Sequence, residues 1–341
     1  MGVTFAVEQV VSTFLDSRGQ RQDVTIQLRR DPLTGRTGRV AHFLGFAVHP
    51  EDFADLAEAS RAVCPFCPER VTAMTGRWPE DLVPGGRLSR GEAWLFPNVS
   101  PYDAYSAVVA LTARHDVAID QLTAAQLADG LRLSAELAQR VRAARPPGPA
   151  HTVVGMNLLP PAGSSLVHPH LHALVTDHPG DREEQELAAS RAWRAEHGRP
   201  YLADLIDAER DGERFVAAGS HTSWLTAFVS RSLMSDALGI VHGTSHLEDL
   251  DDAALDELTR GLTQVLGHLA SLGVRSCNLS VTGDAQGHDD RWLCVRVSPR
   301  AYLTTYAHVN DTGVLPHLFD EVVMMRPPEQ FAAELREVVT L

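Results

Sequence analysis

One pattern of apolar segments occurs twice in this chain of 341 residues. Each copy begins with two short apolar segments and a histidine, continues with a long amphipathic segment, and ends with two more apolar segments. The separation of Trp94 and His115 in the first copy is nearly that of Trp224 and His246 in the second. Short apolar runs predict strands, and apolar residues that recur every three or four positions predict a helix. The sequence therefore predicts an α+β fold with two tandem halves, in which a mostly antiparallel sheet is flanked by helices.

Each half is expected to place strands on both sides of one helix. In the first half we expect strands at 93–96, 107–111, 151–159 and 167–175. In the second half we expect strands at 223–225, 238–241, 276–281 and 292–297. Thr123 and Gln126 form a capping box that predicts the start of the first helix. Gly273 is expected to end the second helix.

The repeat divides the chain into three parts. Residues 1–180 make up the expected first half, residues 181–215 a connector, and residues 216–341 the second half. The connector is charged, but Trp193 and Leu202 indicate helices that Pro200 separates. We therefore expect a packed connector rather than a flexible linker. Residues 327–339 predict one amphipathic helix near the end of the sequence.

The composition excludes several classes of protein. All 30 basic residues are arginine, so the chain has no P-loop, no Schiff base with pyridoxal phosphate and no protein-kinase ATP lysine. A formal net charge of −14 argues against binding to nucleic acid or to an anionic membrane. No apolar run approaches the ~20 residues that cross a bilayer, and the sequence does not begin with a basic stretch followed by an apolar one. A soluble, cytoplasmic protein is expected.

Three histidines alternate within the apolar stretch 166–175. Because strand side chains point alternately to the two faces, His168, His170 and His172 are expected to share one face. Pro169 cannot donate to a sheet ladder, so this end of the strand is expected at a sheet edge or open towards a site. A solvated polar face that happens to be rich in histidine is the plainer explanation. We favour a catalytic strand, because imidazole binds metals, transfers protons and acts as a nucleophile near neutral pH.

Cys64 and Cys67 form a C-x-x-C pair, whereas Cys277 and Cys294 stand alone. Secreted disulfide frameworks are smaller and richer in cysteine, so a disulfide framework is not expected. A C-x-x-C pair is either redox-active or half of a metal site. We favour zinc, because two histidines from elsewhere complete a tetrahedral site and no thioredoxin-like strand-to-helix pattern follows the pair. The two lone cysteines are expected to be buried apolar side chains.

Together these motifs resemble those of the galactose-1-phosphate uridylyltransferase family, the nucleotidyltransferase branch of the histidine-triad superfamily. The matching segments cover most of the chain. They are residues 30–35 (Arg-Asp-Pro-Leu-Thr-Gly), the cysteine pair with Pro68, residues 96–98 (Phe-Pro-Asn), His115, the spacing from Asn157 to residues 168–170 (His-Pro-His), and residues 319–337. The resemblance implies two histidine-triad-like halves, of which only the first keeps the histidines. By this resemblance, the chain looks like a divergent member of the family.

The resemblance implies one structural zinc ion, held by Cys64, Cys67, His115 and His168. Four protein ligands close the tetrahedron and leave no position for water. The His-x-His pair that forms a further metal site in some relatives is missing from the second half, so a single metal is expected. The zinc is expected to fix the position of His170, which matches the family's nucleophile.

The family's nucleotide and phosphate contacts fall on a second set of residues. Asn98 matches an asparagine of the nucleotide pocket, and Asn157 precedes the loop that contains Gly163, Ser164 and Ser165. In a chain without lysine, this loop is expected to offer backbone amides and hydroxyls to phosphate oxygens. An ordinary turn between strands is the plainer explanation of the loop.

Two features depart from the family. The family usually has glutamine two positions after the nucleophile, where this chain has His172. His-x-His-x-His is the pattern of the nucleotide-hydrolysing branch, so His172 is expected to contact the phosphate and is also placed to protonate a leaving group. The family's basic loop is replaced by residues 41–46, Ala-His-Phe-Leu-Gly-Phe. His172 leaves transferase and hydrolase both open, and the replaced loop points away from the family's usual substrate.

Three functions remain open on the sequence. The first is a nucleotidyltransferase that moves a nucleoside monophosphate from a nucleotide or nucleotide-sugar donor to a phosphorylated small-molecule acceptor, such as a sugar phosphate. It would work by double displacement through a nucleotidyl-His170 intermediate. The second is a hydrolase or phosphorylase of nucleotide conjugates. The third is a zinc-stabilised nucleotide-binding protein without catalysis. The family's members are often homodimers, and a homodimer is suggested here by that resemblance alone.

Overall fold

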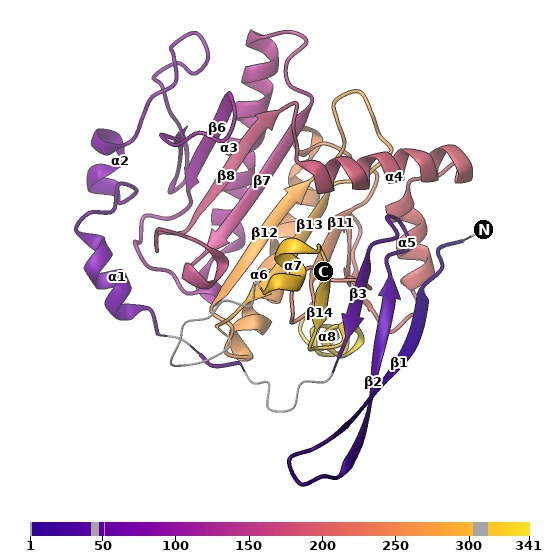
Figure 1. Ribbon diagram of the computed structural model, residues 1–341. Coiled ribbons are helices and arrows are strands. Elements are labelled where there is room, and N and C mark those ends of the chain that lie inside the picture. The colour runs from indigo at the N-terminus through magenta and orange to yellow at the C-terminus, as the bar shows by residue number, and fades with distance from the viewer. Residues whose placement is uncertain (1, 42–47, 51, 303–312) are drawn as a thin grey trace.

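The computed structural model describes residues 2–41, 48–50, 52–302 and 313–341. These residues form one ten-stranded sheet and one four-stranded sheet. Two long helices, α3 (Ala124–Ala144) and α6 (Asp252–Ser271), pack together against one face of the large sheet (Figure 1). We call the opposite face of this sheet the front face. The architecture is the α+β fold that the sequence predicts.

The large sheet contains the predicted repeat. Its strands are β4 (Leu88–Arg90), β5 (Ala93–Pro97), β6 (Tyr105–Ala110), β7 (His151–Leu158), β8 (His170–Thr176), β9 (Phe215–Ala218), β10 (Thr222–Thr226), β11 (Ala237–Val241), β12 (Ser276–Thr282) and β13 (Cys294–Arg300). Their order is β4-β5-β6-β8-β7-β12-β13-β11-β10-β9, and all neighbours are antiparallel. The last five strands repeat the order of the first five in reverse. Because β7 pairs with β12, the two halves share one sheet.

Local sequence explains the two long helices and the core behind the sheet. The predicted capping box is present at the start of α3, where the Thr123 side chain accepts from the Gln126 backbone and the Gln126 side chain accepts from the Thr123 backbone. The apolar stripes of both helices pack on alternate side chains of the strands, including Leu171, Ala173 and Val175 of β8. The intervening side chains of β8, among them His170 and His172, therefore lie on the front face.

A smaller sheet packs on the second half. It contains β1 (Ala6–Leu15), β2 (Arg21–Arg30), β3 (Thr37–Val40) and β14 (Val322–Met324), in that order. The Phe5 ring lies 5.1 Å from that of Phe228, and Arg29 pairs with Glu329 at 2.9 Å. The β1–β2 hairpin extends away from the rest of the chain (Figure 1). Sequence analysis did not predict this sheet.

Shorter helices complete the described fold. They are α1 (Ala54–Arg61), α2 (Pro68–Met74), α4 (Asp181–His197), α5 (Tyr201–Glu209), α7 (Val314–Leu318) and α8 (Pro328–Arg336), with 3-10 turns η1 (Ile119–Gln121), η2 (Pro160–Ala162) and η3 (Leu247–Asp249). The connector is helical and packed as predicted: α4 ends at Gly198, and Pro200 immediately precedes α5. The predicted C-terminal helix forms but stops at Arg336. The domain boundaries at 180 and 215 stay a prediction. Among the described helices, none has an apolar stretch of the length that crossing a membrane requires.

The structure corrects one prediction about the histidine strand. We expected a strand over 167–175 whose proline end lay at a sheet edge or opened towards a site. Strand β8 begins at His170 rather than at residue 167, and it lies between β6 and β7, so the expected edge position is wrong. The alternative, an end that opens towards a site, is not contradicted. The later start arises because Pro169 has no N–H for the ladder, whereas its carbonyl accepts from the Leu111 N–H at 3.0 Å. The chain before Pro169 is thus free to leave the sheet, and His168 lies outside the strand.

Candidate functional site

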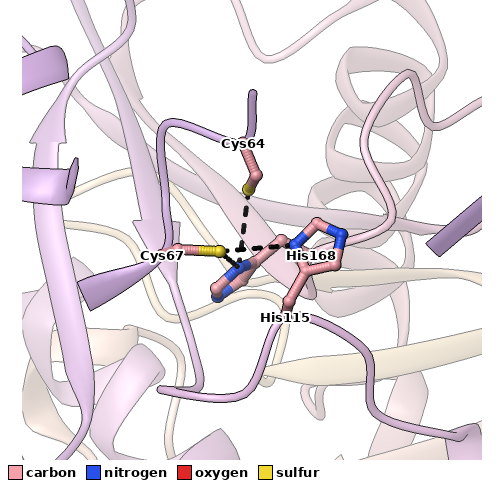
Figure 2. Close-up of side chains that lie close together, drawn as sticks. All are labelled: Cys64, Cys67, His115 and His168. Carbon is pink, nitrogen blue, oxygen red and sulfur yellow. Dashed lines mark hydrogen bonds between the residues drawn. The ribbon is translucent and has the colours of Figure 1, made fainter. Parts of the chain in front are cut away.

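Four buried side chains converge beside the start of β8. Cys64 and Cys67 flank the loop before α2, while His115 follows β6 and His168 precedes β8. Their candidate ligand atoms all lie within 4.8 Å of one another. The Cys67 sulfur lies 3.4 Å from His115 Nδ1 and 3.9 Å from His168 Nδ1, and the Cys64 sulfur lies 3.7 Å from His168 Nδ1 (Figure 2). These are the four residues that the family resemblance implies as zinc ligands, and the structure brings them together.

Outer hydrogen bonds fix both imidazoles with Nδ1 towards the sulfurs. His168 Nε2 donates to the Thr112 carbonyl at 2.8 Å. The Ser60 hydroxyl donates to the Leu56 carbonyl, so its oxygen is left to accept from His115 Nε2 at 3.1 Å. A histidine that binds a metal through one nitrogen commonly donates from the other to such a partner. The geometry fits a tetrahedral ion with two sulfur and two nitrogen ligands.

Electrostatics in the cluster also favour a metal. Burial lowers the pKa of His168 to about 4 and lowers that of His115, so both rings are neutral at pH 7. Burial also raises the pKa of the Cys64 thiol to about 11. Without a cation the buried Cys64 thiol has little reason to ionise, whereas a bound dication stabilises a thiolate directly. The cluster can therefore hold one metal ion in a fully protein-liganded site.

His170 is the first residue of β8 and is 6% exposed. Its Nδ1 donates to the His168 carbonyl at 2.8 Å, so the lone pair of the neutral ring is on Nε2. Burial lowers the pKa of His170 to about 4, which keeps the ring neutral. The ring of Phe66, which lies between the two cysteines in sequence, contacts that of His170 at 5.3 Å. The cysteine loop thus packs directly on the candidate nucleophile.

His172 lies next to His170 on the front face. The ring centroids of His170 and His172 are 5.1 Å apart, and the centroid of the Tyr102 ring lies 5.6 Å from that of His172. Burial lowers the pKa of His172. Among the described residues, no hydrogen-bond partner reaches its buried Nδ1. His172 therefore retains a polar atom that a bound substrate can satisfy.

The predicted phosphate loop is tied to the second half of the chain. Asn278 of β12 donates to the Asn157 side chain at 2.7 Å and to the Ala162 carbonyl at 2.9 Å. Gly163 has φ +86° with open space where a side chain would start, as expected for a backbone that a ligand approaches closely. The Ser164 hydroxyl donates to the Leu166 carbonyl, and Ser165 is exposed.

Asn98 is not brought into contact with the histidines. It follows β5, and its side chain bonds Ser106 at 3.5 Å and accepts from the Ser100 backbone at 3.0 Å. Strand β6 separates β5 from β8, so Asn98 lies about two strand spacings, roughly 10 Å, from β8. The replaced basic loop cannot be placed, because residues 42–46 lie outside the described residues.

Sequence reasoning missed three contacts of this site: Phe66, Tyr102 and Asn278. Phe66 and Tyr102 are aromatic residues, and the sequence alone does not show whether such residues lie in the core or on the surface. Asn278 comes from the second half, and only the β7–β12 pairing places it opposite Asn157. The available signal was the predicted strand 276–281, whose polar positions alternate with apolar ones.

Comparison with known proteins places this geometry in a known fold. No protein-family model matches the chain. An uncharacterized protein of Archaeoglobus fulgidus is 28% identical over 326 residues, which is 94% of each chain. A galt-like protein from Arabidopsis thaliana has a TM-score of 0.68 at 17% identity and covers 92% of this chain and 99% of its own.

Two further solved structures are similar. A uridylyltransferase has a TM-score of 0.65 at 19% identity, with 91% of this chain and 97% of its own covered. An ADP-glucose phosphorylase from Arabidopsis thaliana, solved with bound ADP-glucose, has a TM-score of 0.66 at 15% identity, with 93% and 99% covered. These similarities confirm the fold that the motifs imply. At low sequence identity, the chain has the fold of the galt-like protein, the uridylyltransferase and the ADP-glucose phosphorylase.

Proposed function

We propose that this protein is a nucleotidyltransferase that works by double displacement through His170. The single observation that carries the proposal is the geometry of that ring. Its Nδ1 is held by the His168 carbonyl, which leaves the Nε2 lone pair on the face of the sheet opposite the helices. A neutral imidazole fixed in one tautomer is suited to attack phosphorus. The similarity in fold to a uridylyltransferase and an ADP-glucose phosphorylase supports the same class of reaction.

The proposed reaction has two steps. Nε2 of His170 forms a bond to the α-phosphorus of a nucleotide or nucleotide-sugar donor, while the bond from that phosphorus to the leaving phosphate oxygen breaks. An oxygen of a phosphorylated acceptor, such as a sugar phosphate, then bonds to the phosphorus while the nitrogen–phosphorus bond breaks. Nδ1 keeps its proton throughout, and the phosphate leaving group needs none. One hard displacement becomes two easier ones.

The other predicted residues support these steps. We propose that one structural zinc ion is held by Cys64, Cys67, His115 and His168. Its role would be to fix the loop that contains Phe66. We assign Asn157, Gly163, Ser164 and Ser165, together with His172, to the phosphates, and Asn98 to a more distant part of the nucleotide. Backbone amides and hydroxyls are suitable partners for phosphate oxygens in a chain without lysine.

A phosphorylase or hydrolase is the second candidate, and His172 favours it. Its unpartnered Nδ1 and its position next to His170 suit a group that binds or protonates a leaving oxygen. In this version, inorganic phosphate or water takes the place of the phosphorylated acceptor in the second step. For both candidate functions, we propose the cytoplasmic location that the sequence predicts.

Rapid trapping of the intermediate tests the proposal. The protein is mixed with a panel of nucleoside diphosphate sugars labelled in the α-phosphate, without acceptor, and then denatured in alkali. We expect label that acid removes and that peptide mapping places on His170. A parallel sample of labelled protein is left native and exposed to inorganic phosphate, glucose 1-phosphate or buffer alone before the alkali quench. The acceptor that releases the label fastest separates transferase, phosphorylase and hydrolase. Nucleotide binding without any labelling would instead favour a binding protein that lacks catalysis.

We also propose that two copies of the chain form a homodimer through the β1–β2 hairpin. Every residue of β1 is exposed, and one face of the hairpin carries Val10, Phe14 and Ile26. A two-stranded ribbon with an exposed apolar face is marginal in water, and its free edge pairs readily with an identical strand. Sedimentation velocity is expected to give a dimer, and the double substitution Val10→Asp and Phe14→Asp a monomer. A monomeric wild-type protein would rule out this arrangement.

A further inference from the structure

Three side chains from the two halves form one chain of hydrogen bonds on the front face. Arg300 Nε donates to Asn278 Oδ1 at 2.6 Å, and Asn278 Nδ2 donates to Asn157 Oδ1 at 2.7 Å. Asn278 Nδ2 also donates to the Ala162 carbonyl at 2.9 Å. No step of the proposed reaction uses the second half. This chain nevertheless connects two residues of the second half to a proposed phosphate contact of the first.

The sheet register places this chain beside the start of β8. Directly opposite residues of neighbouring strands share a face, and Gly155 is opposite His172. Asn157 lies two residues further along β7 and His170 two residues earlier on β8, so both are on the front face at the same end of the two strands. On its other side, β7 pairs with β12, where Asn278 is opposite Asn157 (Figure 1). Asn157 is thus about one strand spacing, ~5 Å, from the strand that contains His170.

The two outer partners of Asn278 allow its amide only one orientation. A guanidinium has only donors, so the amide oxygen must face Arg300. A backbone carbonyl can only accept, so the amide nitrogen must face Ala162. Both partners require the same orientation, in which the nitrogen is also the atom that contacts Asn157.

The orientation of Asn278 in turn fixes that of Asn157. The nitrogen of Asn278 can only donate, so Asn157 must turn its oxygen towards β12. Asn157 Nδ2 then faces away from β12, and it makes no hydrogen bond among the residues that the structure describes. Asn157 is half-buried, so a ligand on the front face can reach this nitrogen.

Other donors near Asn157 are already engaged. The N–H groups of Gly163 and Ser164 donate to carbonyls of their own turn at 2.8 and 3.2 Å. The Ser164 hydroxyl donates to the Leu166 carbonyl at 2.7 Å. A phosphate would have to share these hydrogens with the turn. The Asn157 nitrogen is not shared in this way, so a phosphate oxygen at this turn gains most from it.

We propose that Arg300 and Asn278 are positioning residues that turn the amide nitrogen of Asn157 towards the phosphate of the bound nucleotide. The inference rests on the proposed function and adds two residues of the second half to its phosphate site. An amide that was free to rotate would present its oxygen to the phosphate for part of the time. Oxygen repels a phosphate anion, whereas an N–H group binds it. Fixing the amide before the ligand arrives therefore strengthens binding.

Asn278→Asp reverses the hydrogen bond to Asn157 without changing the shape of the side chain. One carboxylate oxygen can still accept from Arg300, but the other replaces the nitrogen that faces Asn157. We expect Asn157 to rotate, donate to the carboxylate and turn its own oxygen towards the phosphate. The affinity for a nucleoside monophosphate, relative to that for its nucleoside, should then fall about 10-fold or more, because a hydrogen bond to a charged group is lost.

Isothermal titration calorimetry on the resting protein measures this ratio without any chemistry. The ligands are AMP with adenosine and UMP with uridine, and the two nucleosides report any loss that does not involve the phosphate. Ser280→Asp is the matched control, because it adds a carboxylate to the same face of β12, opposite Gly155 and Arg296 instead of Asn157. Its affinity ratio should stay close to that of wild type. The melting temperature of each variant shows whether it folds.

Asn278→Ala separates positioning from packing. Alanine removes every contact of the side chain, but it only lets Asn157 rotate and does not force its oxygen towards the phosphate. Positioning therefore predicts a larger fall in the affinity ratio for Asn278→Asp than for Asn278→Ala, whereas a purely structural role predicts the reverse order. If the aspartate variant does not fold, the alanine variant alone must lower the ratio.

Four results overturn the inference. They are monophosphates that bind wild type no more tightly than their nucleosides, an unchanged ratio in the Asn278 variants, an equal fall in Ser280→Asp, and a larger fall with alanine than with aspartate. The expected order, with Ser280→Asp close to wild type, supports it. Because labelling of His170 is measured on the wild-type protein, the proposed function can stand when this inference fails. Since binding needs no covalent step, the inference can also hold when labelling fails.

Discussion

Replacing His170 with asparagine is expected to lower kcat/KM for nucleotidyl transfer by at least about 10³-fold. The asparagine amide can still donate to the His168 carbonyl, as Nδ1 does now at 2.8 Å. It has no atom in the place of Nε2, so the covalent step is lost while the start of β8 keeps its hydrogen bond. The measurements are steady-state kinetics and the yield of labelled protein after a quench.

Two comparisons make this result specific. Nucleotide affinity and melting temperature of His170→Asn should stay close to wild type, because no metal ligand and no core contact on the helix side of the sheet is removed. His178→Asn is the control, since it makes the same change at an exposed position soon after β8. A His170→Asn protein that labels as fast as wild type would show that another residue is the nucleophile.

Much of the fold was predictable because its signals are local. The capping box at Thr123 and the apolar period of α3 and α6 fix the helices, and the short apolar runs between them fix the strands. The repetition of this pattern predicted the two halves. Strand β8 begins later than predicted because apolar alternation continues past Pro169, and only the missing N–H of the proline marks the true start.

The small sheet was not predictable in the same way. Strand β14 near the end of the chain pairs with β3 near its beginning, and no local pattern specifies a partner so distant in sequence. The residues of β1 are all exposed. The strand therefore has no buried face, and its sequence lacks the alternation of apolar and polar residues that predicts a strand.

The residues of the candidate site show the same difference between local signals and contacts that depend on the fold. The four proposed metal ligands and His170 were found because cysteine and histidine in close motifs have few structural explanations. Phe66, Tyr102 and Asn278 were missed, because their roles depend on which side chains the folded sheet places next to them. For Asn278, the register between β7 and β12 determines this neighbour, because it places Asn278 opposite Asn157. A local sequence pattern does not specify the register between two strands that are far apart in the chain.

Replacing Cys67 with alanine is expected to remove the metal and to destabilise the protein. Its sulfur is within 3.9 Å of both imidazole nitrogens, so three ligands would remain for a site that is otherwise closed. Loss of a structural zinc should cost at least ~3 kcal/mol, which corresponds to a fall of roughly 6–12 °C in melting temperature for a domain of this size. Plasma mass spectrometry should find about one zinc per chain in wild type and almost none in the variant. Cys277→Ala is the matched control, because Cys277 is fully buried on β12 and away from the cluster.

The same substitution should also slow the labelling of His170, although Cys67 does not contact that ring. The connection is Phe66, which lies between the two cysteines and contacts His170 at a centroid distance of 5.3 Å. When the metal no longer closes the loop, Phe66 is free to leave the ring, and His170 loses the packing that aims Nε2. Phe66→Ala separates the two effects: it should keep the zinc but lower the labelling rate about 10-fold, because misplacement of a reacting group by even ~1 Å is costly. If Phe66→Ala labels at the wild-type rate while Cys67→Ala does not, the metal acts on His170 through His168 and the backbone instead, and the aromatic contact is only core packing.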